Sequence, residues 1–255
     1  MEKNIILAGV GGQGILSIAF VIDNAALDAG FEFKQAEVHG MAQRGGAVQS
    51  NLRYGDSKIW SDIIPTGRAD MVLSVEPLEV MRYRHYLQPG GWVVTSTTPY
   101  VNIPDYPETD SLLADLAELE NIIMVDTAHF ARAAGNLRAQ NMVTVGAASP
   151  LLDFEEDRLL AFVEMLFARK GEKMVDVNQR AFRFGRAAGL FFRALVDARM
   201  PRIAALSLIG KLDPETLDET HAGAWAEALA DNEAKLETVL AEEEAVACDR
   251  ASAFA

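Results

Sequence analysis

The sequence predicts an α/β protein with a doubly wound, Rossmann-like sheet and a helical C-terminal extension. The first apolar run, NIILAGV at 4–10, is rich in branched side chains and ends in glycines, as buried parallel strands do. Strand-like and helix-like segments then alternate, which is typical of a doubly wound sheet. Strand signals stop at about residue 141. We therefore expect a Rossmann-like domain at 1–200 and a helical acidic extension at 201–255.

The expected elements follow from the spacing of the apolar residues. The segment 15–30 keeps a helical pattern that Gly30 ends, and the turn signal Pro89-Gly90-Gly91 precedes the fifth strand. Six strands are expected, at 4–10, 34–40, 47–55, 70–76, 91–98 and 121–126. The helical remainder is expected to form helices at 141–152, 155–169, 176–198 and 223–247.

Two of these helices carry side chains that predict how they pack. An apolar stripe along the last helix predicts packing on its own domain, and a contact with another subunit remains the alternative. On the helix at 176–198, Gly185 and Gly189 would permit a close helix contact. Its arginines are expected to pair with carboxylates or to lie in solvent. The stripe consists of Trp225, Leu229, Leu236, Val239 and Val246, and the arginines are Arg180, Arg183, Arg186 and Arg193.

The charge and the composition limit the classes of function. The chain has 37 acidic and 23 basic residues, a net charge of -14, which argues against nucleic acid or a membrane surface as the partner. Its single cysteine, Cys248, cannot form a disulfide framework or hold an iron–sulfur cluster, and its four histidines show no metal-ligand spacing. We expect a cytoplasmic protein without a metal site, because the N-terminal apolar run is too short to span a membrane.

The loop GVGGQG at 9–14 has the spacing of a dinucleotide-binding fingerprint. Gly9, Gly11 and Gly14 satisfy G-x-G-x-x-G directly after a strand and at the start of a helix. Such a turn lets amide groups and a helix N-terminus approach an anion closely. Gly12 adds another position without a side chain, and Gln13 adds an amide that can donate and accept. The alternative is that the glycines only allow a tight turn between strand and helix.

The end of the second strand weakens the nicotinamide interpretation. A nicotinamide enzyme should carry an acidic residue there, roughly 20 residues after the glycine loop, to bind the ribose hydroxyls. Glu37 is the nearest candidate, but the strand ends on His39-Gly40 and not on a carboxylate.

A second compact motif, HGMAQRGG at 39–46, follows the second strand. Arg44 could hold a phosphate or a carboxylate in its planar fork, and His39 could move a proton near neutral pH. Gly40, Gly45 and Gly46 allow this loop unusual backbone angles. We expect the two loops to meet at the carboxyl edge of the sheet, where α/β proteins bind ligands.

Other polar residues follow later strands and should reach the same edge. Glu76, after the fourth strand, could act as a base or pair with Arg44. Asp126 and Thr127, after the sixth strand, are expected to cap a helix rather than to bind a ligand.

Three stretches taken together resemble a known family. The gamma-type module of the 2-oxoacid:ferredoxin oxidoreductases is similar to GVGGQG, EVHGMAQRGGAVQSNLR and ADMVLSVEPLEVMRYRHYLQPGG. The second and third stretches resemble most the sequence of the beta subunit of indolepyruvate ferredoxin oxidoreductase. The resemblance covers residues 4–150 well, and the order of the three motifs is far more specific than the glycines alone. The family's archaeal beta subunits are shorter, so the helices after about residue 200 depart from the family pattern.

The resemblance implies a two-part enzyme that oxidatively decarboxylates an aryl-pyruvate to its acyl-CoA and passes electrons to ferredoxin. It implies a large alpha subunit with thiamine diphosphate and iron–sulfur clusters, a cofactor-free small subunit, and a dimer of heterodimers. The two loops would then border the partner's thiamine site and contact coenzyme A, with His39, Arg44 and Glu76 as the catalytic candidates. The implied binding residues are Gly9, Gly11, Gly12, Gln13, Gly14, Gly40, Gln43, Gly45 and Gly46.

Two other functions remain open from the sequence. The first is a free-standing NAD(P)-binding oxidoreductase, with Arg44 on a 2′-phosphate and His39 or Glu76 as acid or base. The second is an interaction module whose long C-terminal helix recruits partners. Nucleotide affinity and turnover by the isolated chain would separate the first from a subunit that needs its large partner.

Overall fold

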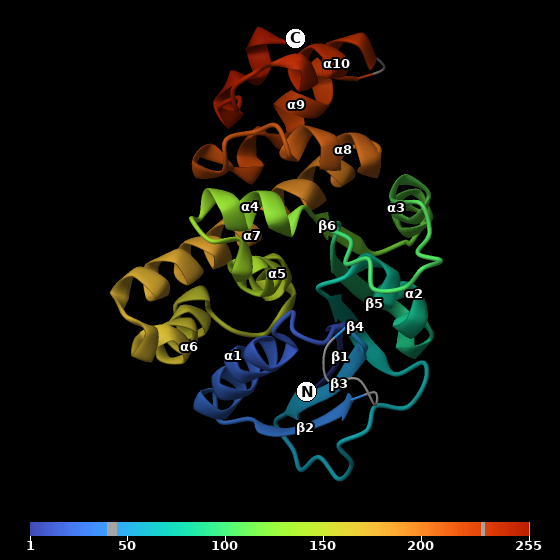
Figure 1. Ribbon diagram of the computed structural model, residues 1–255, viewed down its shortest axis with the longest axis vertical. Coiled ribbons are helices and arrows are strands. Elements are labelled where there is room, and N and C mark those ends of the chain that lie inside the picture. Colours follow the sequence, from blue (N-terminus) through green and yellow to red (C-terminus); the bar gives the residue numbers. More distant parts are fainter. Residues whose placement is uncertain (40–44, 231–232, 255) are drawn as a thin grey trace.

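The computed structural model of the chain describes residues 1–39, 45–230 and 233–254, without the side chains of His39 and Glu233. A six-stranded sheet lies between two groups of helices (Figure 1). The strands are β1 (Glu2–Val10), β2 (Glu32–His39), β3 (Ala47–Gly55), β4 (Ala69–Ser74), β5 (Leu87–Ser96) and β6 (Ile122–Val125). The helices that flank the sheet are α1 (Ile15–Asp28), α2 (Pro77–Tyr83), α3 (Thr109–Ala117), α4 (Thr127–Ala133), α5 (Gln140–Ala148), α6 (Glu156–Phe167) and α7 (Glu172–Asp197).

The strand order β2-β3-β1-β4-β5-β6 departs from a fully parallel Rossmann sheet at one side. β4, β5 and β6 run parallel to β1, as expected, whereas β3 lies antiparallel between β1 and β2. Because β2 is antiparallel to β3, it again points in the direction of β1. The carboxyl ends of β1, β2 and β4 therefore share one edge of the sheet, and the predicted α/β class is confirmed with a mixed sheet.

The central strand is buried on both faces. Ile5, Ile6, Leu7 and Ala8 of β1 are all fully buried, which is why the sequence shows a continuous apolar run there instead of an alternation. Ile5 and Leu7 belong to the main core with α1, and Ile6 packs in a smaller cluster on the opposite face. α1, α5, α6 and α7 cover the first face, and α2 with α3 covers the second (Figure 1).

The fifth strand begins earlier than the sequence predicts. β5 starts at Leu87 and runs through Pro89-Gly90-Gly91, which was expected to be a turn before the strand. The pairing with β4 is irregular between Ala69 and Met71, so the glycines occupy a bulge and not a turn. Gly90 has a φ of +76°, which a glycine adopts without strain.

The helices α5 and α7 cross at very short range. A Cβ added to Gly146 of α5 would lie 1.9 Å from the Phe182 backbone oxygen, and one added to Gly185 of α7 would lie 2.0 Å from that of Val143. Gly189 continues this contact against Ala147. The predicted close helix contact is confirmed, with Gly146 as a third glycine that the sequence analysis did not include.

Three of the four arginines of α7 have the surroundings that the sequence predicts, whereas Arg193 lies over an aromatic ring. Arg180 forms an ion pair with Glu215, and Arg186 lies 2.9 Å from a carboxylate oxygen of Glu156. Arg183 is exposed. Arg193 lies over the Trp92 ring, with 4.9 Å between its guanidinium carbon and the ring centre.

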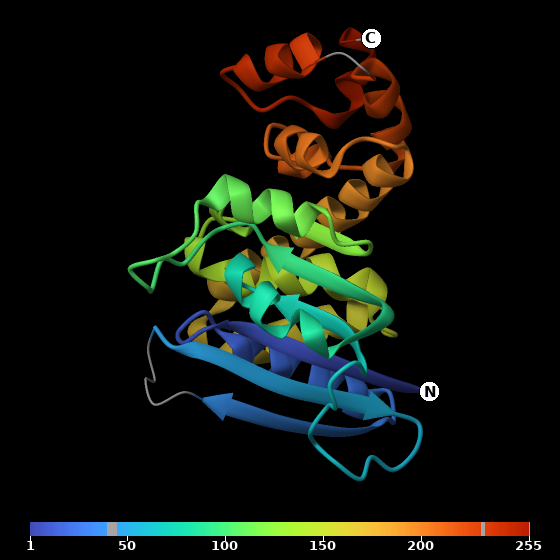
Figure 2. The ribbon, with the colours of Figure 1, turned by 90° about the vertical axis from the view of Figure 1, so that its right-hand side faces the viewer.

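The C-terminal segment forms three helices, α8 (Arg202–Ile209), α9 (Ala222–Ala228) and α10 (Glu233–Ala241), at the end of the molecule away from β2 (Figure 2). The expected single helix at 223–247 is wrong, and α8 was not predicted. Asp231 and Asn232, whose residue types favour helix ends over helix interiors, separate α9 from α10 in the sequence.

The apolar stripe nevertheless packs within this chain. Trp225 and Val239 are fully buried, and Val246 forms an isolated bridge with Leu212. The Trp225 indole N–H donates to the Cys248 backbone oxygen at 2.7 Å. The expectation that the stripe packs on its own domain is therefore confirmed, whereas the domain boundary at residue 200 stays a prediction. Among the described residues, no helix is both long and apolar enough to cross a membrane.

Candidate functional site

The glycine loop closes the end of β1 against β4. A Cβ on Gly9 would lie 2.5 Å from Cγ2 of Val75, so a larger residue would push the two strands apart. Gly12 and Gly14 have φ values of +104° and +85°, where side chains cause strain. Gly14 is also the N-cap of α1, and no side chain caps this helix. The loop thus ends on an open helix N-terminus.

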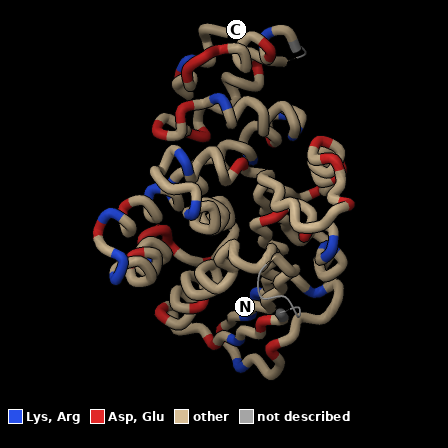
Figure 3. The backbone as a smooth tube through the Cα atoms, viewed as in Figure 1, with Lys and Arg blue, Asp and Glu red and all other residues tan. Residues whose placement is uncertain are grey.

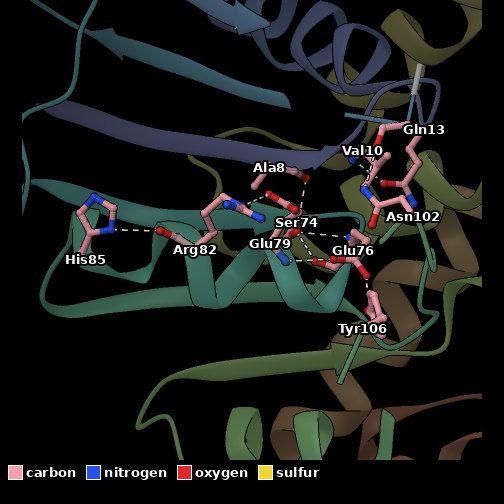
Figure 4. Close-up of polar contacts among 11 residues, drawn as sticks. Ala8, Val10, Gln13, Ser74, Glu76, Glu79, Arg82, His85, Asn102 and Tyr106 are labelled. Carbon is pink, nitrogen blue, oxygen red and sulfur yellow. Dashed lines mark hydrogen bonds and ion pairs between the residues drawn. The ribbon is translucent and has the colours of Figure 1, made fainter. Parts of the chain in front are cut away.

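Gln13 holds the loop together from inside. Its Oε1 accepts from the Val10 backbone N–H at 2.7 Å, and its Nε2 donates to the Val75 backbone oxygen at 3.3 Å. The side chain thus joins the end of β1 to the residue that follows β4, and Figure 4 shows its contact with Val10. We expected an amide free to bind a ligand at the mouth of the crevice, but both ends of this amide bond to the backbone.

The second motif meets the first through the backbone. The Gly11 N–H donates to the Gly46 oxygen at 2.9 Å, and the Gly45 N–H donates to the Gly11 oxygen at 3.3 Å. The prediction that the two loops meet at one edge is confirmed by these contacts. His39 is the last residue of β2, and its side chain lies outside the described part of the chain, as do Gly40, Gln43 and Arg44.

A third loop, residues 97–108, reaches the same place. Asn102 Nδ2 donates to the Gly45 oxygen at 2.8 Å (Figure 4). Sequence analysis did not identify Asn102, although its position soon after β5 places it at the carboxyl edge of a parallel strand. Three loops from β1, β2 and β5 are thereby joined by hydrogen bonds.

Glu76 anchors the third loop from the end of β4. Its side chain is 1% exposed, and Oε2 accepts from the Glu79 backbone N–H at 2.9 Å, so Glu76 is the N-cap of α2. Oε1 accepts from the Tyr100 backbone N–H at 3.3 Å and from the Tyr106 hydroxyl. Glu76 followed by Pro77 and Glu79 is a helix-start pattern that could have predicted this cap. Its predicted catalytic role stays a prediction.

The electrostatic surroundings favour this arrangement of donors and acceptors. Burial, followed by the Glu76 carboxylate, raises the pKa of Tyr106, which stays protonated and donates its hydrogen. Burial also raises the pKa of Glu79, although Arg82 opposes that shift with a contact of 3.1 Å. Figure 4 shows Glu79 in the first turn of α2, next to the N-cap Glu76.

Asp126 and Thr127 have structural partners. The Asp126 side chain accepts from the His129 backbone N–H at 3.0 Å and caps α4, as predicted. The expectation that Thr127 also caps a helix is wrong, because Thr127 is the first residue of α4. Its hydroxyl lies 2.6 Å from that of Ser96 and donates to Gln140 Oε1 at 3.0 Å. These groups connect β5, β6 and α5 beneath the third loop.

Two hollows flank the glycine loop. The larger, of about 480 Å³, lies between this loop and the helices α5 to α7. The smaller, of about 260 Å³, lies toward β2 and β3 and is lined in part by Leu16, Glu37 and Val48. Exposed apolar side chains, those of Leu16, Val38, Tyr100 and Val101, stand on the elements around this edge. Within the described part of the chain, no group of three or more His, Cys, Asp or Glu residues could hold a metal ion.

The strand order separates this site from a dinucleotide crevice. In a Rossmann sheet the second strand lies beside the first, and its terminal carboxylate binds the ribose. Here β3 lies between β1 and β2, so the two strand ends are about 10 Å apart instead of about 5 Å. The glycine loop instead borders the loop of the hairpin formed by β2 and β3. Together the two loops can bind an anion and cover a reacting centre.

Comparisons with known proteins agree with the motifs. A family model described as pyruvate ferredoxin/flavodoxin oxidoreductase matches residues 4–188. The indolepyruvate oxidoreductase subunit IorB of Thermococcus kodakarensis is 37% identical over 194 residues, which are 72% of this chain and 94% of that protein. The subunit of the same name from Methanothermobacter thermautotrophicus is 36% identical over 74% of this chain and 99% of its own length.

Solved structures share the fold. The gamma subunit of a keto/oxoacid ferredoxin oxidoreductase from Geobacter sulfurreducens has a TM-score of 0.55 at 22% identity, with 74% of this chain and 97% of that chain covered. A 2-oxoglutarate:ferredoxin oxidoreductase from Magnetococcus marinus, solved with 2-oxoglutarate, coenzyme A and succinyl-CoA bound, has a TM-score of 0.59 at 24% identity. The match covers 74% of this chain but 31% of that longer polypeptide.

Proposed function

Because this chain belongs to the pyruvate ferredoxin/flavodoxin oxidoreductase family, we propose that it is the small subunit of a 2-oxoacid:ferredoxin oxidoreductase that acts on an aryl-pyruvate such as indolepyruvate. Its large partner subunit would carry thiamine diphosphate and iron–sulfur clusters. The substrate would lose its carboxylate as CO₂, its acyl group would join the sulfur of coenzyme A, and two electrons would pass to ferredoxin. Curated relatives named for indolepyruvate support the substrate class.

The observation that carries the proposal is the joining of three loops at one edge of the sheet. Backbone hydrogen bonds connect Gly11 with Gly45 and Gly46, and Asn102 adds the loop after β5. A surface fixed in this way can cover a neighbouring active site without first becoming ordered. The exposed apolar side chains around the edge, among them Leu16 and Val101, favour a protein partner there.

We assign the residues of this edge to binding and enclosure. The open amides of the glycine loop and Arg44 would hold an anionic part of coenzyme A, and His39 would move a proton at the partner's site. Enclosure would exclude water from the reactive intermediate. We assign Glu76 a positioning role, since three donors of this chain already occupy its two oxygens. With one cysteine, this chain would leave the clusters to its partner.

The first test replaces the arginine of the second motif. In the complex with the large subunit, Arg44→Ala should lower the rate of indolepyruvate oxidation and raise the KM for coenzyme A, by about tenfold or more for a lost charge-assisted contact. Arg84→Ala is the matched control, because Arg84 is exposed at the far end of α2. An unchanged rate together with unchanged coenzyme A saturation would contradict the role of the motif.

The second test concerns the partner. Native mass measurement of the complex, purified from its source and analysed for iron, sulfide and thiamine, should give a large subunit with these groups in a dimer of heterodimers. The alternative, a free-standing NAD(P)-binding oxidoreductase, predicts instead that the isolated chain binds and turns over NADH. That result would overturn the proposal.

A further inference from the structure

The hydrogen bonds at the carboxyl edge of the sheet close on themselves, and we call this closed set the edge ring. Four short segments take part, and each is bonded to two others. A closed ring holds its segments more firmly than a row of contacts with free ends, because every segment is fixed from two sides. The segments are 11–13, 75–76, 100–102 and 45–46.

Side chains form the first two links of the ring. Gln13 Nε2 donates to the Val75 backbone oxygen at 3.3 Å, which connects the glycine loop with the residue after β4. Glu76 follows Val75, and its Oε1 accepts from the Tyr100 backbone N–H at 3.3 Å and from the Tyr106 hydroxyl. The Glu76 side chain is buried, so water competes little for these bonds. The end of β4 thus holds both the glycine loop and the third loop.

Asn102 makes the link that closes the ring. Its Nδ2 donates to the Gly45 backbone oxygen at 2.8 Å (Figure 4). The Gly45 N–H donates in turn to the Gly11 oxygen at 3.3 Å, and the Gly11 N–H donates to the Gly46 oxygen at 2.9 Å. Gly11 precedes Gln13, the first link, by two residues. Because Gly45 is held from both sides, its position against the glycine loop depends on Asn102.

The ring is held by directional hydrogen bonds and not by ion pairs. Glu76 is the one charged residue in its four segments, and no Lys or Arg of the described ranges forms an ion pair with it. Lys and Arg gather instead at the turn between α6 and α7 (Figure 3). A hydrogen bond restricts angles as well as distance, so the ring sets the orientation of the glycine loop.

We propose that Asn102 is a positioning residue of the oxidoreductase, which holds the glycine loop through Gly45 in the arrangement that the reaction requires. This inference rests on the proposed function, which assigns the glycine loop to the reacting site. Asn102 acts through the backbone of Gly45 and not by contact with the substrate. A small displacement of an active-site group lowers the rate even when the substrate still binds. Loss of the Asn102 donor should therefore lower kcat more than it raises KM.

The first experiment measures kcat and KM for indolepyruvate in the complex with the large subunit. Asn102→Asp keeps the shape of the side chain but replaces the donor with an acceptor, so kcat should fall about tenfold or more and KM should change less than about twofold. Asn121→Asp is the matched control, because Asn121 Nδ2 also donates to a glycine oxygen, that of Gly90, outside the ring. Equal kcat values for the two variants would overturn the proposal, as would a loss that lies in KM alone.

A double-variant cycle tests whether the ring is closed. Gln13→Ala opens the ring at another link, and no hydrogen bond joins the Gln13 and Asn102 side chains in the described structure. Once one link is lost, the loss of a second should add little, so the double variant should have about the kcat of the slower single variant. Losses that multiply would show that the two links act independently, and would overturn the ring.

Amide hydrogen exchange of the isolated full chain separates this inference from the proposed function. In Asn102→Asp the Gly11 and Gly45 amides should exchange about fivefold faster or more, as the loss of one hydrogen bond allows, and in Asn121→Asp they should not change. An inactive wild-type complex with this faster exchange would refute the proposed function and leave the ring standing. An active wild-type complex with unchanged exchange in Asn102→Asp would refute the role of Asn102 and leave the proposed function standing.

Discussion

The carboxyl edge of the sheet and the helical layer beside it both contain glycines and a buried carboxylate, yet they use them differently. At the edge, Gly12 and Gly14 adopt positive φ angles in a turn, whereas in the layer Gly146 and Gly185 lie in regular helices whose backbones touch. The first pair allows a backbone conformation that other residues rarely adopt, and the second pair allows two helix backbones to lie in contact. A side chain would therefore strain the backbone of the turn in the first region and force two helices apart in the second.

The two carboxylates differ in the same way. Glu76 at the edge has three donors, while Asp23 of α1, which is 6% exposed, has an Oδ1 without a partner in the described structure. Burial raises the pKa of Asp23 to about 7. A buried polar group stabilises a fold when it is bonded and destabilises it when it is not. The edge is thus organised by satisfied polar contacts, whereas the helical layer leaves a carboxylate oxygen of Asp23 without a partner among the described residues.

The largest expected effect is that of Gly146→Ala. The new Cβ would lie 1.9 Å from the Phe182 backbone oxygen, so α5 and α7 would have to separate. We expect the free energy of unfolding to fall by more than about 3 kcal/mol, measured by urea denaturation. Gly223→Ala in α9 is the control, since nothing lies within 4 Å of its new Cβ; it should cost nothing. Equal stabilities would mean that the two helices do not touch through their glycines.

Asp23→Asn should show the next largest effect, with a defined pH dependence. The folded pKa of about 7 exceeds the ordinary value of 3.8, so the folded state holds the proton more tightly and the wild-type stability falls as the pH rises through this window. Asn cannot ionise, so the variant should gain up to about 4 kcal/mol over the wild type at pH 8 and none below pH 4. Urea denaturation at several pH values measures this. Parallel curves for the two proteins would show that Asp23 is not the titrating group.

Glu76→Gln should have a smaller and more local effect. An amide keeps one acceptor oxygen and turns an N–H₂ group toward the donors, which leaves one of them unsatisfied at a cost of about 1.5 kcal/mol. Residues 97–108 should then exchange their amide hydrogens faster, while the β1 amides stay protected. Unchanged amide hydrogen exchange of residues 97–108 in this variant would show that Glu76 does not hold the loop in place.

Gly12→Ala should have the smallest effect on stability. Nothing lies within 4 Å of its new Cβ, so the cost is the strain at φ +104°, about 1 kcal/mol. Gly30→Ala, at φ +81° with open space at the other end of α1, should cost the same. In the enzyme complex only Gly12→Ala should lower the activity, because its Cβ would enter the surface that we propose to face the partner subunit. Equal activities of the Gly12→Ala and Gly30→Ala complexes would show that the glycine loop has no role in the reaction.

Much of the fold could be predicted from the sequence because burial leaves a pattern. The strands of the sheet follow from apolar runs, and the meeting of GVGGQG with the second motif follows from two strands that point the same way. The start of β5 was missed because a Pro-Gly-Gly sequence suits a bulge as well as a turn. The break between α9 and α10 interrupts a stripe that continues across it, so periodicity alone did not reveal it.

The contacts of the site were harder to predict than its location. Gln13 and Asn102 have polar side chains suited to ligands, and only three-dimensional proximity shows that both bond to the backbone. The antiparallel position of β3 also follows from pairing between distant strands, which one sequence does not specify. The residue types in each motif thus predicted which segments form the candidate site. Contacts between distant segments determine which of their polar atoms remain free to bind a ligand.

The long helix α7 has a mechanical consequence. Its 26 residues extend for about 39 Å without a break, from Met174 and Asn178 in the larger hollow beside the glycine loop, through the glycine crossing with α5, to the start of the C-terminal segment. Arg202 at the start of α8 donates to the backbone oxygens of Ala117 and Glu120, which ties the same end to α3. The C-terminal helices are therefore attached to a rigid strut, and a force on them reaches the wall of the hollow through one element.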